Sequence, residues 1–138
     1  MTQESAPRRV LVIDDEPGVR GYVRRALDAA GYVVDEAAGG RIGIDLMDKA
    51  PDLVLLDLGL PDMSGEEVLR HIRTARPWVP VIVWTAGSDA HAEVRCRSLG
   101  SHAFLRKPLP LSTLLTSIGQ VGRASPNAAD TTRSGGFG

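Results

Sequence analysis

The sequence has little of several features that mark specialised protein classes. Its one cysteine, Cys96, allows no disulfide within the chain and excludes a cysteine-rich zinc site. Lys plus Arg number 16 and Asp plus Glu 17, so the net charge of −1 offers no basic excess for nucleic acid or an anionic membrane. No apolar run approaches the roughly 18 residues of a membrane span, and the first residues are polar, unlike a secretory signal. We therefore expect a cytoplasmic protein that binds neither nucleic acid nor membrane directly.

Three short apolar runs are the strongest indications of secondary structure. They are residues 10–13 (VLVI), 53–56 (LVLL) and 81–84 (VIVW). Their residues are mostly β-branched or Leu and lack the alternation of a half-exposed strand, which is typical of parallel strands buried on both faces. Residues 32–34 and 103–105 are two weaker strand candidates.

Amphipathic helical patterns fill the gaps between these runs. Pro17 suits the first turn of one helix, which Gly31 ends, and Ser64 with Glu67 forms a capping box for another. A weaker apolar stripe begins at Ile42, and a thin one spans a helix expected to begin near Ser88. The predicted helices are residues 17–30, 42–50, 65–75, 88–99 and 110–121.

Strict alternation of strand and helix predicts one α/β domain over residues 8–122. Such alternation implies right-handed crossovers and a doubly wound parallel sheet covered by helices on both sides. The 138 residues suffice for one such domain. Residues 123–138 contain no Val, Leu or Ile, so we expect this segment, and residues 1–7, to be disordered.

Polar side chains follow four of the five predicted strands. Asp14 and Asp15 follow the first, Asp57 the third, Thr85 the fourth and Lys107 the last. Ligands of open parallel sheets bind outside the carboxyl ends of the strands, so these groups are expected at one edge. Taken singly, Asp14 and Asp15 are equally consistent with caps of the first helix, whereas Asp57 is more often a turn residue and Thr85 most often a turn hydroxyl. Their joint occurrence at strand ends favours a site.

The charges of these groups indicate a divalent cation. Asp14, Asp15 and Asp57 carry three negative charges and Lys107 returns one positive charge. Hard carboxylate oxygens suit Mg²⁺, which commonly completes its shell with water and phosphate oxygens. This favours phosphoryl chemistry, in which an aspartate can itself be the nucleophile and form an acyl phosphate.

The motifs resemble those of the response-regulator receiver domains of two-component signalling. They are VLVIDDE (10–16), PDLVLLDLGLPDMSG (51–65), VIVWTA (81–86) and FLRKPL (104–109). The resemblance implies a flavodoxin-like sheet of strand order 2-1-3-4-5. Receiver domains are among the standard examples of this order, in which ligands bind where the strand order reverses.

The same resemblance implies the roles of particular residues. Asp57 would accept a phosphoryl group from a phosphohistidine of a sensor histidine kinase or a histidine phosphotransfer protein. Mg²⁺ would be bound by Asp15, Asp57 and the backbone carbonyl of Gly59, with Asp14 acting mainly through water. Lys107 would contact the phosphoryl group, and Thr85 and Phe104 would be the switch pair. Gly59 and Gly87, two positions after Asp57 and Thr85, have no side chain to orient a hydrolytic water.

Two other functions are weighed against this signalling role. The first is a phosphohydrolase with an aspartyl nucleophile, which commonly needs a second acid where Gly59 stands. The second is a small flavin carrier of the same fold class, whose FMN phosphate would be repelled by the acids at 14–16. We expect a signalling module that catalyses only its own phosphorylation and dephosphorylation. Residues 123–138 are too few for a helix-turn-helix, so we expect a stand-alone receiver or one trimmed from a longer regulator, acting on a downstream protein that the sequence does not name.

Overall fold

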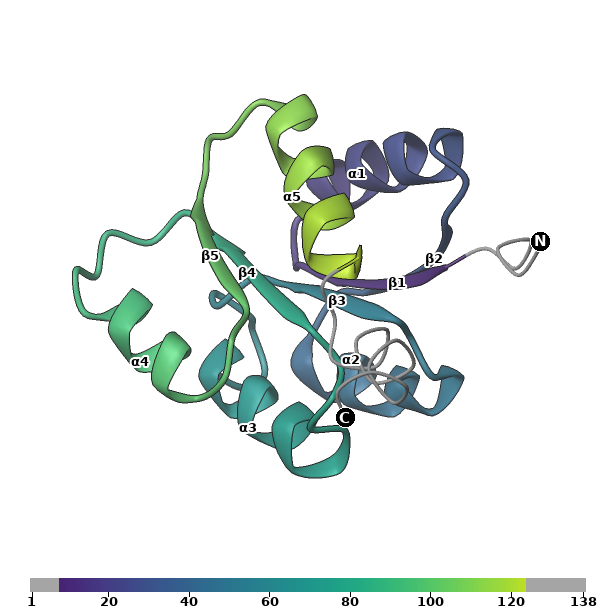
Figure 1. Cartoon of the computed structure of the whole chain (residues 1–138). Helices are drawn as coiled ribbons and strands as arrows, with labels where there is room; N and C mark the ends of the chain where they lie inside the picture. Colours follow the sequence, from purple (N-terminus) through teal and green to yellow (C-terminus); the bar gives the residue numbers. More distant parts are fainter. Residues whose placement is uncertain (1–7, 124–138) are drawn as a thin grey trace, which may run out of the picture.

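The five predicted strands form one parallel sheet. The computed structural model describes residues 8–123, and Figure 1 shows the sheet with helices on both of its faces. The strand order is β2-β1-β3-β4-β5, the flavodoxin-like order expected from the resemblance. The strands are β1 (Arg9–Ile13), β2 (Val33–Ala37), β3 (Leu53–Leu56), β4 (Val81–Thr85) and β5 (Ala103–Arg106).

The helices follow the strands in strict alternation. They are α1 (Pro17–Ala29), α2 (Gly40–Leu46), continued by the 3-10 turn η2 (Met47–Lys49), then α3 (Gly65–Ala75), α4 (Ala92–Ser98) and α5 (Leu111–Arg123). Half of the predicted capping box is present at α3: the Glu67 amide donates to Ser64 Oγ at 3.1 Å, whereas the Ser64 amide makes no bond to the Glu67 carboxylate. Pro17 occupies the first turn of α1, as predicted.

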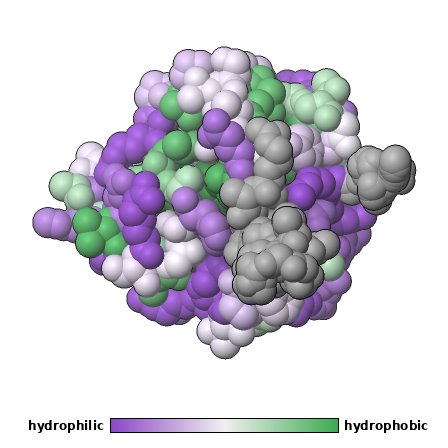
Figure 2. All heavy atoms as spheres, viewed as in Figure 1, coloured by the Kyte–Doolittle hydropathy of each residue, from purple (hydrophilic) through white to green (hydrophobic). Residues whose placement is uncertain are grey.

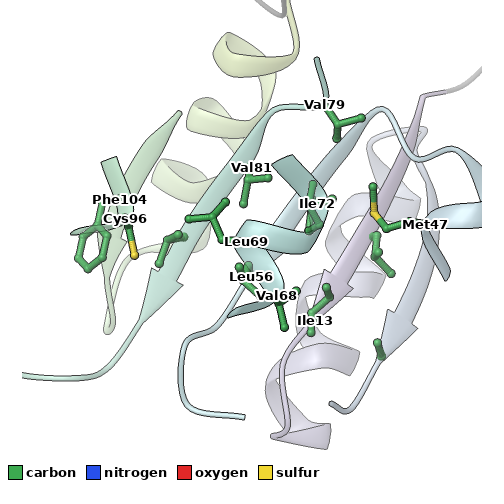
Figure 3. Close-up of a cluster of buried hydrophobic side chains, with 14 of the residues drawn as sticks. Ile13, Met47, Leu56, Val68, Leu69, Ile72, Val79, Val81, Cys96 and Phe104 are labelled. Atoms are coloured by element: carbon green, nitrogen blue, oxygen red, sulfur yellow. The ribbon is translucent and has the colours of Figure 1, made fainter. Parts of the chain in front are cut away.

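Two apolar layers enclose the sheet. α1 and α5 cover one face, while α2, α3 and α4 lie on the other (Figure 1). The second layer includes Leu56, Leu69, Ile72 and Cys96, all less than 2% exposed. Figure 3 shows Cys96 and Phe104 at one end of this cluster and Met47 toward the other. The single cysteine, Cys96, is therefore a core residue of α4.

The prediction for α2 was wrong about Ile42, although Leu46 and Met47 of the same stripe do pack in the core. Ile42 is 54% exposed, although it was expected to begin the apolar stripe. The buried positions are instead Gly40 and Gly43. A Cβ at Gly43 would lie 2.6 Å from Ile13 Cδ1, so α2 approaches β1 closely on its glycine face and turns Ile42 to solvent.

The fourth helix begins later than predicted. Residues 86–91 are not helical, and α4 starts at Ala92 rather than near Ser88. The Asp89 side chain accepts a hydrogen bond from the His91 amide at 2.8 Å, so it closes a local turn instead of starting the helix. The segment after Thr85 is therefore a loop at the sheet edge.

The surface carries few large apolar side chains. Figure 2 shows small hydrophobic patches among hydrophilic residues on the face it presents. The exposed large hydrophobic residues among those described are Tyr22, Ile42, Trp78 and Val94. Within residues 8–123, no helix combines the length and the hydropathy needed to cross a membrane. The expected disordered segments lie outside the described residues, apart from Arg123, which ends α5.

Candidate phosphoryl-transfer site

The parallel register brings the predicted site residues to one edge of the sheet. Ile13 pairs with Leu56, so the residues that follow, Asp14 and Asp57, lie side by side at the ends of β1 and β3. The ladder continues past the strands, because the Asp57 amide donates to the Ile13 carbonyl at 2.9 Å. On the other side, the Lys107 amide donates to the Thr85 carbonyl at 2.9 Å. These backbone hydrogen bonds fix the positions of the Cα atoms from which the site side chains extend.

Three carboxylates converge at this edge. One carboxylate oxygen from each of Asp14, Asp15 and Asp57 lies within 4.8 Å of the other two. Asp14 and Asp57 are buried, with 2% and 8% of their surface exposed, whereas Asp15 is exposed. Buried acids are uncommon unless they are paired, so this cluster is a strong indication of a functional site.

Lys107 supplies the compensating charge. Its Nζ donates to Asp14 Oδ2 at 2.7 Å and lies 3.5 Å from Asp57 Oδ2 and 3.6 Å from Glu16 Oε1. Burial alone would lower the pKa of Lys107, but the hydrogen bond to Asp14 and the surrounding negative charges raise it. The ammonium is therefore firmly protonated and binds Asp14 more closely than Asp57.

Asp14 is held in place by two hydrogen bonds. Besides Lys107, its carboxylate accepts a bond from the Glu16 amide at 3.0 Å. Burial nevertheless raises the pKa of Asp14, outweighing the opposing effects of these two donors, and the charge of Asp57 adds to the increase. The cluster sets three carboxylates against the one ammonium of Lys107.

This cluster fits a magnesium ion. The donors are hard carboxylate oxygens, and Asp15 forms no hydrogen bond or ion pair with the residues that the structure describes. Mg²⁺ is commonly bound by one or two carboxylates and keeps several waters, which needs an open side. Gly59 lines the same cleft, and its amide donates to Asp57 Oδ1 at 3.3 Å. The residues that could hold the ion are therefore Asp14, Asp15, Asp57 and Gly59.

Asp15 and Asp57 line a cleft of about 400 Å³. Thr85 and Lys107 line it beside Asp57, and Gly59 and Gly87 leave it open, since a Cβ at either glycine would meet no atom within 4 Å. Charged residues from α3, the loop after β4, α4 and β5 also line the cleft and form what we call its ionic wall. They are Glu66, Asp89, Arg95 and Arg106.

Sequence reasoning missed this ionic wall. Arg95 binds Glu66 at 2.8 Å and Asp89 at 2.7 Å, and its hydrogen bonds lower the pKa of both acids. The three residues of these ion pairs are not spaced at a regular interval along the chain. Only the packing of α3 against α4 and the loop before it brings them together. Phe104 was predicted from the resemblance, and it is buried, at 7% exposure, beneath the Arg106 guanidinium.

Comparison with known proteins decides the family. The profile of the response regulator receiver domain matches residues 10–119. The chain belongs to the response-regulator receiver domain family. This receiver is 38% identical over 113 residues to response regulator MprA of Mycolicibacterium vanbaalenii, covering 81% of the chain and 49% of that relative. It is 34% identical over 116 residues to transcriptional regulatory protein TrcR of Mycobacterium tuberculosis, covering 83% and 45% respectively.

A solved structure agrees with the fold. The CheY-like response regulator receiver domain protein of Methanospirillum hungatei superposes with a TM-score of 0.84 at 28% identity. The match covers 86% of this receiver and 96% of that chain. By contrast, this receiver spans about half the length of the curated relatives named above. The comparisons therefore establish a signalling module of the two-component family.

Proposed function

We propose that this receiver is a phosphoacceptor in a two-component phosphorelay and that Asp57 is the residue modified. The observation that carries the proposal is the position of Asp57, at the end of the central strand β3, inside the cleft, beside two other acids and within 3.5 Å of Lys107. A carboxylate in this environment can act as a nucleophile toward phosphorus while neighbouring cations offset the charge.

The donor is a phosphohistidine on a sensor histidine kinase or a histidine phosphotransfer protein. A carboxylate oxygen of Asp57 forms a new P–O bond while the P–N bond of the phosphoimidazole breaks. The imidazole nitrogen keeps the electron pair of that bond and then takes a proton from solvent. The product is an aspartyl phosphate, and no other reactant is needed.

Asp14, Asp15, Asp57 and the Gly59 carbonyl would hold Mg²⁺ at this edge. When bound, the ion supplies positive charge that offsets the phosphoryl oxygens as they approach the acids. Lys107 is well placed to help, because its Nζ already lies between Asp14 and Asp57. A phosphoryl group on Asp57 would compete for this ammonium with Asp14.

The phosphorylated site would change the loop after β4 and the α4 region. Phosphorylation adds negative charge and acceptor oxygens at Asp57, and the Thr85 hydroxyl lines the same cleft. We propose that Thr85 moves toward the phosphoryl group and that Phe104 and α4 adjust with it. α4 is only seven residues long and contributes few buried side chains, so it can shift at small cost. The shifted face would alter binding to a downstream protein.

Labelling with a small phosphodonor tests the phosphoacceptor. Acetyl phosphate with Mg²⁺ is expected to add one phosphoryl group, seen by intact-mass spectrometry, and EDTA should prevent it. Asp57→Asn should show no addition, whereas Asp45→Asn, an exposed aspartate of α2, should behave as wild type. Equal labelling of Asp57→Asn would mean that another residue is the acceptor.

Tryptophan fluorescence tests the switch separately. Trp84 is 8% exposed and directly precedes Thr85, and Lys107 Nζ lies 4.9 Å from the centroid of its ring. Beryllofluoride with Mg²⁺, a phosphoryl mimic, is expected to change the emission in wild type, much less in Thr85→Ala, and not in Asp57→Ala. Trp78 lies 45% exposed outside the site and should contribute little. An undiminished response in Thr85→Ala would remove Thr85 from the switch.

A further inference from the structure

The loop between β4 and α4 is held mainly by side chains. Its residues 86–90 are all exposed, and residues 86–88 make no backbone-to-backbone hydrogen bond with any residue that the structure describes. Since strand and helix ladders do not fix this segment, its place over the cleft depends on other donors. Two arginines from neighbouring elements supply them.

Arg106 makes the central contacts. Its guanidinium donates to the carbonyl of Gly87 at 2.8 Å and to that of Asp89 at 3.3 Å. The same guanidinium lies 5.0 Å from the ring centroid of Phe104, within the range of a cation–π interaction. One side chain of β5 therefore touches both the loop that follows Thr85 and the ring of the proposed switch pair.

Arg95 holds the loop from the other side. It binds the Asp89 carboxylate at 2.7 Å and, through two nitrogens, the Glu66 carboxylate of α3 at 2.8 and 3.1 Å. Asp89 is thus fixed twice, through its carbonyl by Arg106 and through its carboxylate by Arg95. This ties the loop to β5, α4 and α3 together.

The strand geometry explains why Arg106 and Lys107 act on different parts of the cleft. Successive side chains along an extended chain point to opposite sides, so Lys107 reaches the acids while Arg106 reaches the loop. Thr85 pairs with Arg106 in the sheet, and the backbone amide of Lys107 donates to the Thr85 carbonyl. The backbone that carries the Thr85 hydroxyl is therefore fixed relative to β5.

We propose that Arg106 is a positioning residue that holds residues 86–89 over the cleft and couples them to Phe104. This inference rests on the proposed function. Thr85, Ala86 and Gly87 line the cleft beside Asp57, so a ligand on Asp57 meets groups that are already in place. Without the hydrogen bonds from Arg106, the loop would sample positions away from the cleft. A ligand that binds at Asp57 would then have to order the loop. Arg106 thus raises the affinity of the Asp57 site for a phosphoryl ligand without contacting the reacting atoms.

The test is the affinity for beryllofluoride at saturating Mg²⁺, followed by the 19F NMR signal of the bound species. Arg106→Met keeps an apolar cover on Phe104 but removes both donors, and it is expected to weaken binding by about three- to tenfold. Arg106→Lys retains one donor and should lie between Arg106→Met and wild type. Arg97→Met is the matched control, since Arg97 pairs only with Glu93 on α4 among the described residues and does not line the cleft.

Coupling to Phe104 is tested by a double-mutant cycle. Phe104→Leu removes the ring beneath the guanidinium, so Arg106→Met should weaken binding less in that background than in wild type. Affinities of Arg106→Met within twofold of wild type, or a loss equal to that of Arg97→Met, would overturn the positioning role. Strictly additive effects with Phe104→Leu would overturn the coupling. Failure of wild type itself to bind beryllofluoride would instead refute the proposed phosphoacceptor function.

Discussion

Gly65, the first residue of α3, is the position where a single methyl group should do most harm near the site. A Cβ built there would lie 2.5 Å from Leu58 Cα and 2.7 Å from the Asp57 carbonyl oxygen, both of them backbone atoms. The Gly65 amide also donates to the Leu58 carbonyl at 3.1 Å, so the contact closes the loop that follows the proposed phosphoacceptor. Neither neighbour can yield by a simple rotation of a flexible side chain.

The expected cost of Gly65→Ala follows from this crowding. Forcing an extra methyl into a packed site costs about 1–3 kcal/mol, more than the roughly 0.5–1 kcal/mol that alanine gains over glycine in a helix interior. With a urea m-value of about 2 kcal/mol/M, a net loss of about 1 kcal/mol lowers the midpoint by about 0.5 M. Because the displaced atoms belong to Asp57 and Leu58, labelling of Asp57 should also slow at equal folded fraction.

Gly18 provides the matched control. It lies in the first turn of α1, and a Cβ there would meet nothing within 4 Å. Gly18→Ala should therefore stabilise the fold by about 0.4–1 kcal/mol, mainly by restricting the unfolded chain. Urea titrations followed by far-UV circular dichroism compare the two variants. If Gly65→Ala were as stable as wild type, the close packing of α3 against the end of β3 would be refuted.

Three further perturbations test the site and its surroundings. Mg²⁺ should raise the unfolding free energy by about 1.4 kcal/mol for each tenfold increase in its concentration above the dissociation constant. If Asp57→Asn showed the same dependence on Mg²⁺ concentration, the ion would bind elsewhere. Burial raises the pKa of the Cys96 thiol to about 11, so the native protein should resist iodoacetamide at pH 8 and react only when urea unfolds it; rapid native alkylation would contradict its burial. Asp62 accepts hydrogen bonds from the Gly40 and Arg41 amides at 2.8 and 2.9 Å, so Asp62→Ala should lower the urea midpoint while the control Asp45→Ala leaves it unchanged; equal midpoints would show that Asp62 does not cap α2.

The sequence carried enough information for the sheet and the acid cluster. Continuous apolar runs such as 53–56 indicated burial on both faces, and β3 is buried at all four of its positions. Once the strands were placed, parallel pairing required Asp14, Asp57, Thr85 and Lys107 to meet at one edge. The N-cap at Ser64 could also be predicted, because it depends only on residues three apart.

Local patterns failed where distant parts of the chain decide the outcome. Ile42 looked like a core residue by spacing, yet the close approach of Gly43 to Ile13 rotates α2 and exposes it. Ser88 looked like a helix start, but it lies in a loop whose Asp89 is bound by Arg95 and Arg106. Such contacts join positions separated along the chain and leave no periodic signal.

The sequence by itself determined the order of strands and helices, the edge at which the chemistry lies and the charges gathered there. Tertiary structure alone decided that Lys107 binds Asp14 more closely than Asp57, that α4 begins at Ala92, and that Arg106 spans from Phe104 to the loop after Thr85. The physical reason is the range of the interactions. Hydrophobic periodicity and capping act between near neighbours in the chain, whereas ion pairs and close packing depend on distances that only the folded chain sets.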